Sequence, residues 1–280
     1  MITLNCNGRL LVLDKPLVMG IINATPDSFY KESRFQGTDK ILEQAEQLLK
    51  QGADILDIGG QSTRPGSEKI SEDEELKRVI EGITIVQKKI PQTFISIDTY
   101  YAKVARQAVD AGACIINDIS GGSIDENMVS TVAALNVPYV LMHMRGTPDT
   151  MQQDTNYKNV TLEVLDFLIW KKNELFKTGI HDVIIDPGFG FGKTITQNFE
   201  LLRNLGVYKM LQCPVILGIS RKSTIYKTLD ITADDALNGS TALHTIGLLN
   251  GADILRVHDV KEAKELIKLV TEYERVDNVQ

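Results

Sequence analysis

Short apolar segments recur along the chain at intervals that suit a repeated unit of strand and helix. Within each segment the apolar residues are nearly continuous rather than alternating with polar ones, as expected for parallel strands covered on both faces. The pattern predicts strands at residues 18–23, 55–59, 94–98, 114–118, 139–144, 183–186, 215–220 and 254–257.

The segments between these strands have the spacing of amphipathic helices. Val79, Ile83 and Val86, for example, are three or four positions apart and would share one helix face. A similar glycine-containing segment recurs at residues 51–57, 111–117 and 250–256. Glycine after the last turn of a helix adopts the left-handed conformation at little cost, so each repeat predicts a helix end followed by a buried strand.

Eight such units predict a closed (β/α)8 barrel, or TIM barrel, over about residues 18–275. Ahead of it, residues 3–13 place two apolar runs around Asn7-Gly8, a strong signal for a β-hairpin. We expect this hairpin to cap the bottom, or N-terminal end, of the barrel. A doubly wound open sheet is the alternative, but residues 22–26 lack the glycine-rich fingerprint that it needs. No linker divides residues 1–280, which are assigned to one domain.

Composition narrows the class of protein. A hydrophobic fraction of 43% and a charged fraction of 24% are typical of globular proteins, and a net charge of −7 argues against a nucleic-acid partner. No apolar run approaches the ~20 residues that cross a bilayer, and the N-terminus lacks the pattern of a signal peptide. Three scattered cysteines suit a reducing compartment, so a cytoplasmic location without membrane contact is expected.

In a TIM barrel the active site lies at the C-terminal ends of the strands. Those positions carry a selective set of polar residues: Asn23, Asp57, residues 61–64, Asp98, Asn117, His143, Arg145, Asp186, Arg221, Lys222, Arg256 and His258.

One group of these residues suits a flat, nitrogen-rich heterocycle. Its members are Asp98, Asn117, Asp186 and Lys222, each at the end of an otherwise apolar strand. Carboxylates accept hydrogen bonds from ring N–H and amino groups, and a lysine donates to a carbonyl or ring nitrogen. The alternative is structural, since Asp98-Thr99 could instead cap the helix that follows.

A second group suits an anion. Arginine forms bidentate contacts with phosphate, so Arg64 and Arg256, with His258 and the nearby Asn23, predict a phosphate-bearing ligand. Asn23 offers one neutral oxygen to a cation. A Mg²⁺ site there would therefore be completed by ligand phosphate and water.

The stretch DPGFGFGK at residues 186–193 joins a strand-end carboxylate to a glycine-rich loop that ends in lysine. A phosphate-binding P-loop would need its first glycine where Pro187 stands, so that motif is absent. A tight crossover turn is the other interpretation. Lys193 has no role assigned by either pattern.

Eight motifs together resemble those of the dihydropteroate synthases of folate biosynthesis, the targets of sulfonamides. They occur in the family's order, one at each predicted strand, at residues 19–29, 57–66, 96–99, 116–122, 141–146, 186–193, 220–223 and 256–259. The resemblance covers nearly the whole chain.

The resemblance implies a transferase that condenses 7,8-dihydropterin-6-ylmethyl pyrophosphate with 4-aminobenzoate. It assigns the pterin to Asp98, Asn117, Asp186 and Lys222, and the pyrophosphate with its Mg²⁺ to Asn23, Arg64, Arg256 and His258. Pro65, Phe191 and Ser223 would border the aminobenzoate. The residues expected to act in catalysis are Asn23, Arg64, Asp98, Lys222 and Arg256, with Asn23 the metal ligand. A homodimer is also implied.

The chain departs from many family members in two loops. It has Tyr30-Lys31-Glu32-Ser33-Arg34 where many have Ser-Asp-Gly-Gly, and Gln61 where many have Glu. The altered first loop leaves a catalytically inactive paralogue as one alternative. A pterin-binding methyltransferase-like domain, which has a similar barrel, is the other.

Overall fold

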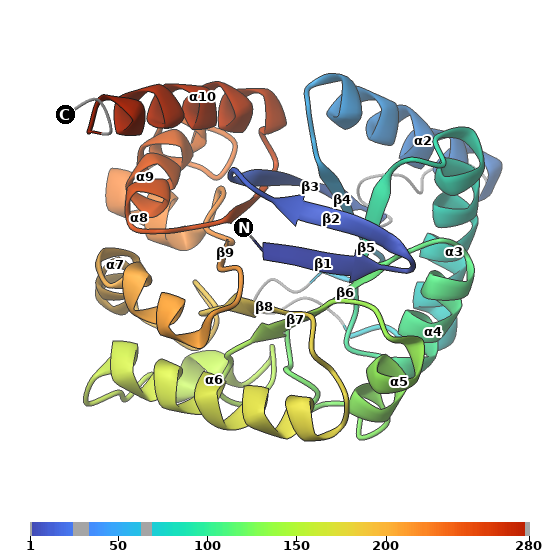
Figure 1. Ribbon diagram of the computed structural model, residues 1–280, viewed down its shortest axis with the longest axis horizontal. Coiled ribbons are helices and arrows are strands. Elements are labelled where there is room, and N and C mark those ends of the chain that lie inside the picture. The colour runs from blue at the N-terminus through green and yellow to red at the C-terminus, as the bar shows by residue number, and fades with distance from the viewer. Residues whose placement is uncertain (1, 25–33, 63–68, 278–280) are drawn as a thin grey trace.

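The computed structural model describes residues 2–24, 34–62 and 69–277, and its centre is a ring of parallel strands (Figure 1). The strands follow the order β8-β7-β6-β5-β4-β3-β10-β9. A bridge between Ile185 and Val215 joins the two ends of this order, so the ring closes. The predicted TIM barrel is confirmed. The strands are β3 (Leu17–Asn23), β4 (Ile55–Gly59), β5 (Phe94–Asp98), β6 (Ile115–Asp118), β7 (Tyr139–Met142), β8 (Val183–Asp186), β9 (Ile216–Leu217) and β10 (Ile254–Val257).

The predicted strand at residues 215–220 is the one that differs most from the structure, because β9 is only Ile216–Leu217. After it the backbone turns: the amide of Lys222 donates to the carbonyl of Ile219, and Arg221 takes a positive φ of 53°. This turn brings Lys222 to the end of the strand.

Helices surround the ring and cover its outer face (Figure 1). Side-chain caps start several of them. Thr194 and Gln197, for instance, form a reciprocal capping box at α7. The expected helix ends are present, since Gly52, Gly112 and Gly251 all have positive φ. The helices are α2 (Arg34–Lys50), α3 (Glu72–Lys89), α4 (Ala102–Asp110), α5 (Met128–Leu135), α6 (Val160–Lys177), α7 (Ile195–Arg203), α8 (Ser223–Leu229), α9 (Leu237–Leu249) and α10 (Val260–Asp277), with short 3-10 turns η1 (Met151–Gln153) and η2 (Leu205–Leu211).

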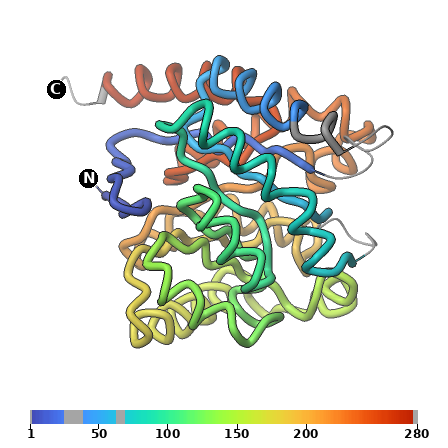
Figure 2. Tube along the Cα trace, turned by 90° about the vertical axis from the view of Figure 1, so that its right-hand side faces the viewer, coloured from blue at the N-terminus to red at the C-terminus, as the bar shows by residue number. Residues whose placement is uncertain are grey.

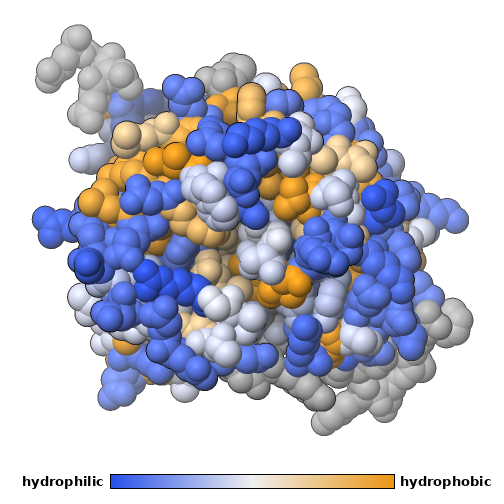
Figure 3. Space-filling model, turned by 90° about the horizontal axis from the view of Figure 1, so that it is seen from below, coloured by the Kyte–Doolittle hydropathy of each residue, from blue (hydrophilic) through white to orange (hydrophobic). Residues whose placement is uncertain are grey.

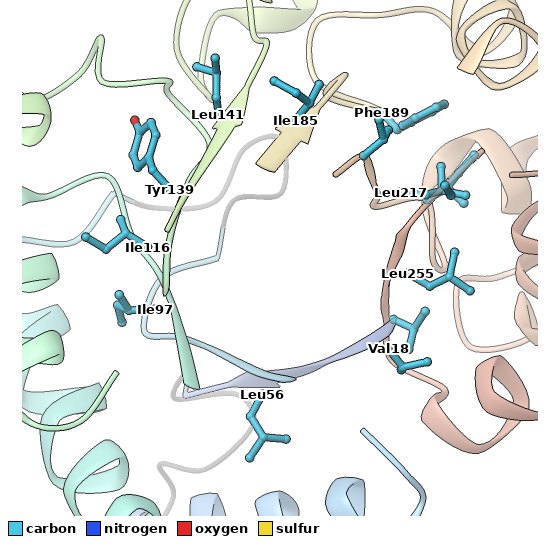
Figure 4. Close-up of a cluster of buried hydrophobic side chains, with 14 of the residues drawn as sticks. Val18, Leu56, Ile97, Ile116, Tyr139, Leu141, Ile185, Phe189, Leu217 and Leu255 are labelled. Carbon is cyan, nitrogen blue, oxygen red and sulfur yellow. The ribbon is translucent and has the colours of Figure 1, made fainter. Parts of the chain in front are cut away.

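The strands carry two different faces. Figure 4 shows one set of side chains pointing outward from the ring toward the helices, among them Val18, Leu56, Ile97, Ile116, Leu141, Ile185 and Leu255. The alternate positions face inward because successive residues of a strand point to opposite sides.

On the molecule's surface, the face that includes α6 is mainly hydrophilic with scattered apolar groups (Figure 3).

The inward positions change character along the barrel. Near the strand starts they are apolar and form one buried cluster that includes Met19, Ile55, Ile115, Val140, Ile184, Ile216 and Ile254. Further along, the same faces of β4, β5, β6, β8 and β10 carry Asp57, Asp98, Asn117, Asp186 and Arg256. The lower barrel is therefore a packed plug, and the polar groups gather above it.

An N-terminal hairpin seals the apolar end. Strands β1 (Ile2–Cys6) and β2 (Arg9–Leu13) pair antiparallel around Asn7 and Gly8, whose φ values of 53° and 83° suit a type I′ turn. Leu4 and Leu11 join the apolar cluster of the lower barrel. Figures 1 and 2 show the hairpin lying across one end of the ring. This is the position predicted from the sequence.

The hairpin's contribution to stability can be measured with Leu4→Ala. Leu4 is only 2% exposed, so the substitution should lower the free energy of unfolding by about 2–4 kcal/mol through lost burial and a cavity. Urea unfolding would measure it. Leu10→Ala is the matched control, because Leu10 is 65% exposed in the same hairpin and its loss should change little. Equal effects at both positions would contradict the plug.

Candidate active site

The register of the parallel strands brings polar side chains side by side at the barrel mouth. Gly59 pairs with Asp98 across β4 and β5, and Asp98 pairs with Asn117 across β5 and β6. Across β7 and β8, Met142 is opposite Asp186. Asp98, Asn117 and Asp186 thus lie at the C-terminal ends of β5, β6 and β8, and Lys222 follows β9 in the same ring.

Arg256 is bound by two carboxylates of this layer. Its Nε donates to Asp57 Oδ2 at 2.6 Å, and its Nη2 donates to Asp98 Oδ2 at 2.6 Å. Asn117 Nδ2 donates to the same Asp57 oxygen at 3.0 Å. Asp57 is fully buried and Asp98 is 9% exposed, so these charges interact in a medium of low dielectric constant.

Burial and pairing shift the protonation equilibria of this cluster. Burial raises the pKa of Asp98 to about 7, although Arg256 opposes the shift. Burial alone would lower the pKa of Arg256, but the carboxylates of Asp57 and Asp98 more than compensate, and it lies above its ordinary value. Asp57 Oδ1 is buried without a hydrogen-bond partner within the described part of the chain.

Asp186 and Lys222 flank a small gap at Gly218. A Cβ atom at Gly218 would be 3.8 Å from both Asp186 Oδ2 and Lys222 Nζ. Asp186 accepts the Gly188 amide at 2.7 Å through its other oxygen. Lys222 donates to the carbonyl of Phe189 at 2.6 Å. Burial raises the pKa of Asp186 and lowers that of Lys222 to about 8, so Lys222 can donate either as an ammonium or as an amine.

Phe191 forms part of an apolar wall beside this gap. It packs in a buried cluster with Tyr100, Ile119, Met142 and Met151. Lys222 Nζ lies 4.6 Å from the centroid of its ring, within cation–π range. The predicted pterin and aminobenzoate residues therefore meet at Lys222.

The predicted anion group is only partly described. Arg64 and Pro65 lie outside the described residues, as do the divergent residues 30–33 of the first loop. His258 Nδ1 is 3.0 Å from Ser220 Oγ, and Asn23 is a partly exposed residue at the end of β3. Ser223 begins α8 next to Lys222. The structure also ties Arg256 to Asp98, so the two groups predicted from the sequence share a charge cluster.

The helix-cap alternative for Asp98 is wrong. Helix α4 begins at Ala102, whose amide donates to Asp125 Oδ2 at 2.8 Å, and the amide of Tyr101 donates to Thr99 Oγ1. Asp98 instead binds Arg256. Its carboxylate belongs to the barrel mouth.

Other strand-end residues have structural partners. Arg221 forms a bidentate pair with Asp259, and Arg145 pairs with Glu163 at 2.6 Å. Asp57 was among the strand-end positions selected from the sequence but was assigned to neither predicted group. Nothing in the sequence pattern showed that it pairs with Arg256.

Comparison with known proteins matches the chain to one enzyme family over most of its length. Residues 19–258 match the family described as pterin binding enzyme. The dihydropteroate synthase of Haemophilus influenzae is 42% identical over 268 residues, covering 95% of this chain and 97% of that protein. That of Bacillus subtilis is 42% identical over 259 residues, covering 92% and 88%.

Solved structures agree with this. The Xanthomonas albilineans dihydropteroate synthase with 4-aminobenzoic acid has a TM-score of 0.90 at 38% identity, covering 97% of this chain and 98% of that one. Its complex with 7,8-dihydropteroate has a TM-score of 0.88 at 36% identity, covering 98% and 99%. The Yersinia pestis synthase in a sulfonamide complex has a TM-score of 0.92 at 36% identity, covering 98% and 100%.

The charge cluster predicts a pH-dependent cost for Arg256→Ala. Removing the cation leaves two buried carboxylates unpaired, which should lower the free energy of unfolding by roughly 3–5 kcal/mol. Burial already raises the pKa of Asp98, and without Arg256 it would rise further above that of the unfolded chain, so the folded variant loses stability as the pH rises. The deficit relative to wild type should be larger at about pH 8 than at about pH 5.

Urea unfolding at both pH values would measure this deficit. Arg275→Ala, which removes an exposed pair with Glu272, should have a small and pH-independent effect. A deficit for Arg256→Ala that shrinks as the pH rises would contradict the pairing.

Proposed function

The chain belongs to the family of pterin binding enzymes, and we infer that it is a dihydropteroate synthase of folate biosynthesis. It condenses 7,8-dihydropterin-6-ylmethyl pyrophosphate with 4-aminobenzoate, and the products are 7,8-dihydropteroate and pyrophosphate. The observation that carries this inference is the set of buried Asp98, Asn117 and Asp186 with the partly exposed Lys222 and Arg256, in a barrel whose relatives of 42% identity are dihydropteroate synthases. A related structure holds the product itself.

The pterin is proposed to bind at the gap beside Gly218. The carboxylates of Asp98 and Asp186 can accept from its ring N–H and amino groups, and Asn117 can both donate and accept. Lys222 now donates to the carbonyl of Phe189 and can donate instead to a ring nitrogen or carbonyl. The apolar plug below closes the site on the side away from the mouth.

The pyrophosphate is proposed to bind Asn23, Arg64, Arg256 and His258. Nε and Nη2 of Arg256 already serve Asp57 and Asp98. Nη1 makes no hydrogen bond within residues 2–24, 34–62 and 69–277, so it can donate to a phosphate oxygen. Arg256 would thereby link the pterin carboxylates to the leaving group.

Magnesium is proposed as the cofactor, held by Asn23 together with the pyrophosphate. No group of three or more His, Cys, Asp or Glu among the described residues could hold a metal ion. Asn23 as a single protein ligand fits a cation bound mainly by phosphate and water, because Mg²⁺ keeps several waters and needs few protein ligands. When bound, Mg²⁺ neutralises charge on the departing pyrophosphate.

The residues present suit a dissociative substitution. The bond between the pterin methylene carbon and the pyrophosphate oxygen breaks, and its electron pair leaves with the pyrophosphate. Buried carboxylates stabilise positive charge on the pterin. The nitrogen of 4-aminobenzoate then bonds to the methylene carbon and releases a proton to solvent. No protein nucleophile is required.

The second substrate is proposed to lie against Phe191, Pro65 and Ser223. Relatives bind 4-aminobenzoic acid or a sulfonamide, and we extend both ligands to this chain. Phe191 supplies an aromatic wall, and Lys222 above its ring marks the boundary with the pterin.

A homodimer and a cytoplasmic location belong to the same proposal. The neighbouring helices α8 and α9 expose Leu229, Ile246 and Leu249, which supports an interface between copies there. Among the described residues no helix is long and apolar enough to cross a membrane. The cytoplasmic location remains a prediction from composition.

The function is tested by pyrophosphate release. We expect release that requires the pterin pyrophosphate, 4-aminobenzoate and Mg²⁺ together, measured with a coupled enzymatic assay. A methyltransferase-like domain would bind the pterin and release none. An inactive paralogue would give the same result, and either outcome would overturn the synthase proposal.

The pterin contacts are tested by Asp186→Asn. Loss of a charged acceptor should weaken the binding of a bare pterin by roughly 1–3 kcal/mol, as measured by titration calorimetry. Asp182→Asn is the matched control at the opposite end of β8, where Asp182 binds the Asn5 amide. Unchanged affinity in Asp186→Asn would remove Asp186 from the pterin site.

A further inference from the structure

Lys193 ends the glycine-rich loop and is buried where no substrate is proposed. Lys193 is only 4% exposed. Nζ lies 2.9 Å from the carbonyl oxygen of Gly188, 3.0 Å from that of Phe191 and 3.3 Å from that of His143. It is also 3.0 Å from His143 Nδ1. Four acceptors therefore converge on one lysine.

These acceptors suit a protonated lysine. Burial lowers the pKa of His143 to about 2, so its ring is neutral at pH 7 and Nδ1 can accept. Burial also lowers the pKa of Lys193 to about 7, while the nearby Asp186 carboxylate favours its charged form. The carbonyl oxygens favour that form as well, because they accept from it.

Each backbone carbonyl from Gly188 to Phe191 accepts a hydrogen bond from a side chain. Lys193 takes those of Gly188 and Phe191, Lys222 takes that of Phe189, and Gln152 Nε2 donates to that of Gly190 at 3.0 Å. Positive φ values at Gly188, Gly190 and Gly192 allow the carbonyls to turn toward these donors. The glycines thus serve the shape of the loop.

The loop also packs closely against His143, the residue that follows β7. A Cβ atom at Gly188 would be 1.9 Å from the carbonyl oxygen of His143 and 3.1 Å from Lys193 Nζ. The amide of Gly188 fixes Asp186 at 2.7 Å, and the carbonyl of the same residue is fixed by Lys193. Lys193 therefore acts on Asp186 through Gly188 and on Phe191 directly.

We propose that Lys193 is a positioning residue of the synthase, whose buried amino group gathers the loop carbonyls and so sets Asp186 for the pterin and Phe191 for 4-aminobenzoate. This inference rests on the proposed function. Lys193 touches neither substrate, since its donors are used within the protein. Its loss should weaken binding of both substrates more than it slows the chemical step.

The test compares Lys193→Met with Lys172→Met. Lys172 is a matched control, because its Nζ donates to a single carbonyl, that of Leu211, away from the barrel mouth. Lys193→Met should raise the KM for 4-aminobenzoate about tenfold or more and weaken bare-pterin binding about tenfold, with kcat at saturation lowered less than about fivefold. Lys172→Met should change none of these.

Circular dichroism and urea unfolding would show that both variants are folded during the assays. If Lys193→Met does not fold, Lys193→Gln replaces it, because glutamine keeps an N–H donor of shorter reach. A smaller increase in KM is expected for Lys193→Gln. Unchanged KM and pterin affinity in a folded variant would overturn the proposal, as would a loss of kcat alone.

The proposal and the synthase function can fail separately. If the wild type releases no pyrophosphate, the function fails, and calorimetry with a bare pterin still tests the role of Lys193. If the wild type is active and Lys193→Met matches it in KM and pterin affinity, only the positioning role fails.

Discussion

The structure depends on the buried ion cluster of Arg256, Asp57 and Asp98. Taking such charges out of water costs several kcal/mol for each ion, so they persist only when each one is well paired. The pairing here joins β4 and β5 to β10, through Nε and Nη2 of Arg256. Because the lower barrel is a buried apolar plug, the same charges act strongly on whatever binds above it. The same paired charges thus determine both the stability of the cluster and the recognition of an ionic, nitrogen-rich substrate.

The second constraint is the loop from Asp186 to Lys193. Its glycines resemble a phosphate cradle, yet the structure directs their backbone toward protein donors. Three carbonyls are held by Lys193 or Lys222, and a fourth by Gln152. The loop therefore presents a carboxylate at one end and an aromatic ring near the other. Anion binding is instead proposed for residues of other strands, with Arg256 shared between both tasks.

The sequence predicted the barrel well because its signals are local. Continuous apolar runs and glycine-ended helices located β4, β5, β8 and β10 at their observed bounds, and Asn7-Gly8 located the hairpin. The shorter β9 was not predictable in this way, because Arg221 in a left-handed conformation turns the chain within an otherwise strand-like run.

Strand-end positions also identified the residues of the mouth, but not their partners. Which carboxylate meets Arg256 depends on the stagger of strands almost two hundred residues apart, since Arg256 and Asp57 are separated by 199 positions. The role of Lys193 depends on four acceptors brought together by a folded loop. Neither leaves a trace in periodicity or spacing.

The most direct measurement is a crystal structure of the protein soaked with a bare pterin. We expect the pterin at the gap beside Gly218, with its nitrogen edge on Asp98, Asn117 and Asp186, and with Lys222 turned from the Phe189 carbonyl to the ring. The Asp186–Lys193 loop should keep its shape. A pterin bound elsewhere, or one in the barrel mouth that contacts none of these four side chains, would contradict this expectation.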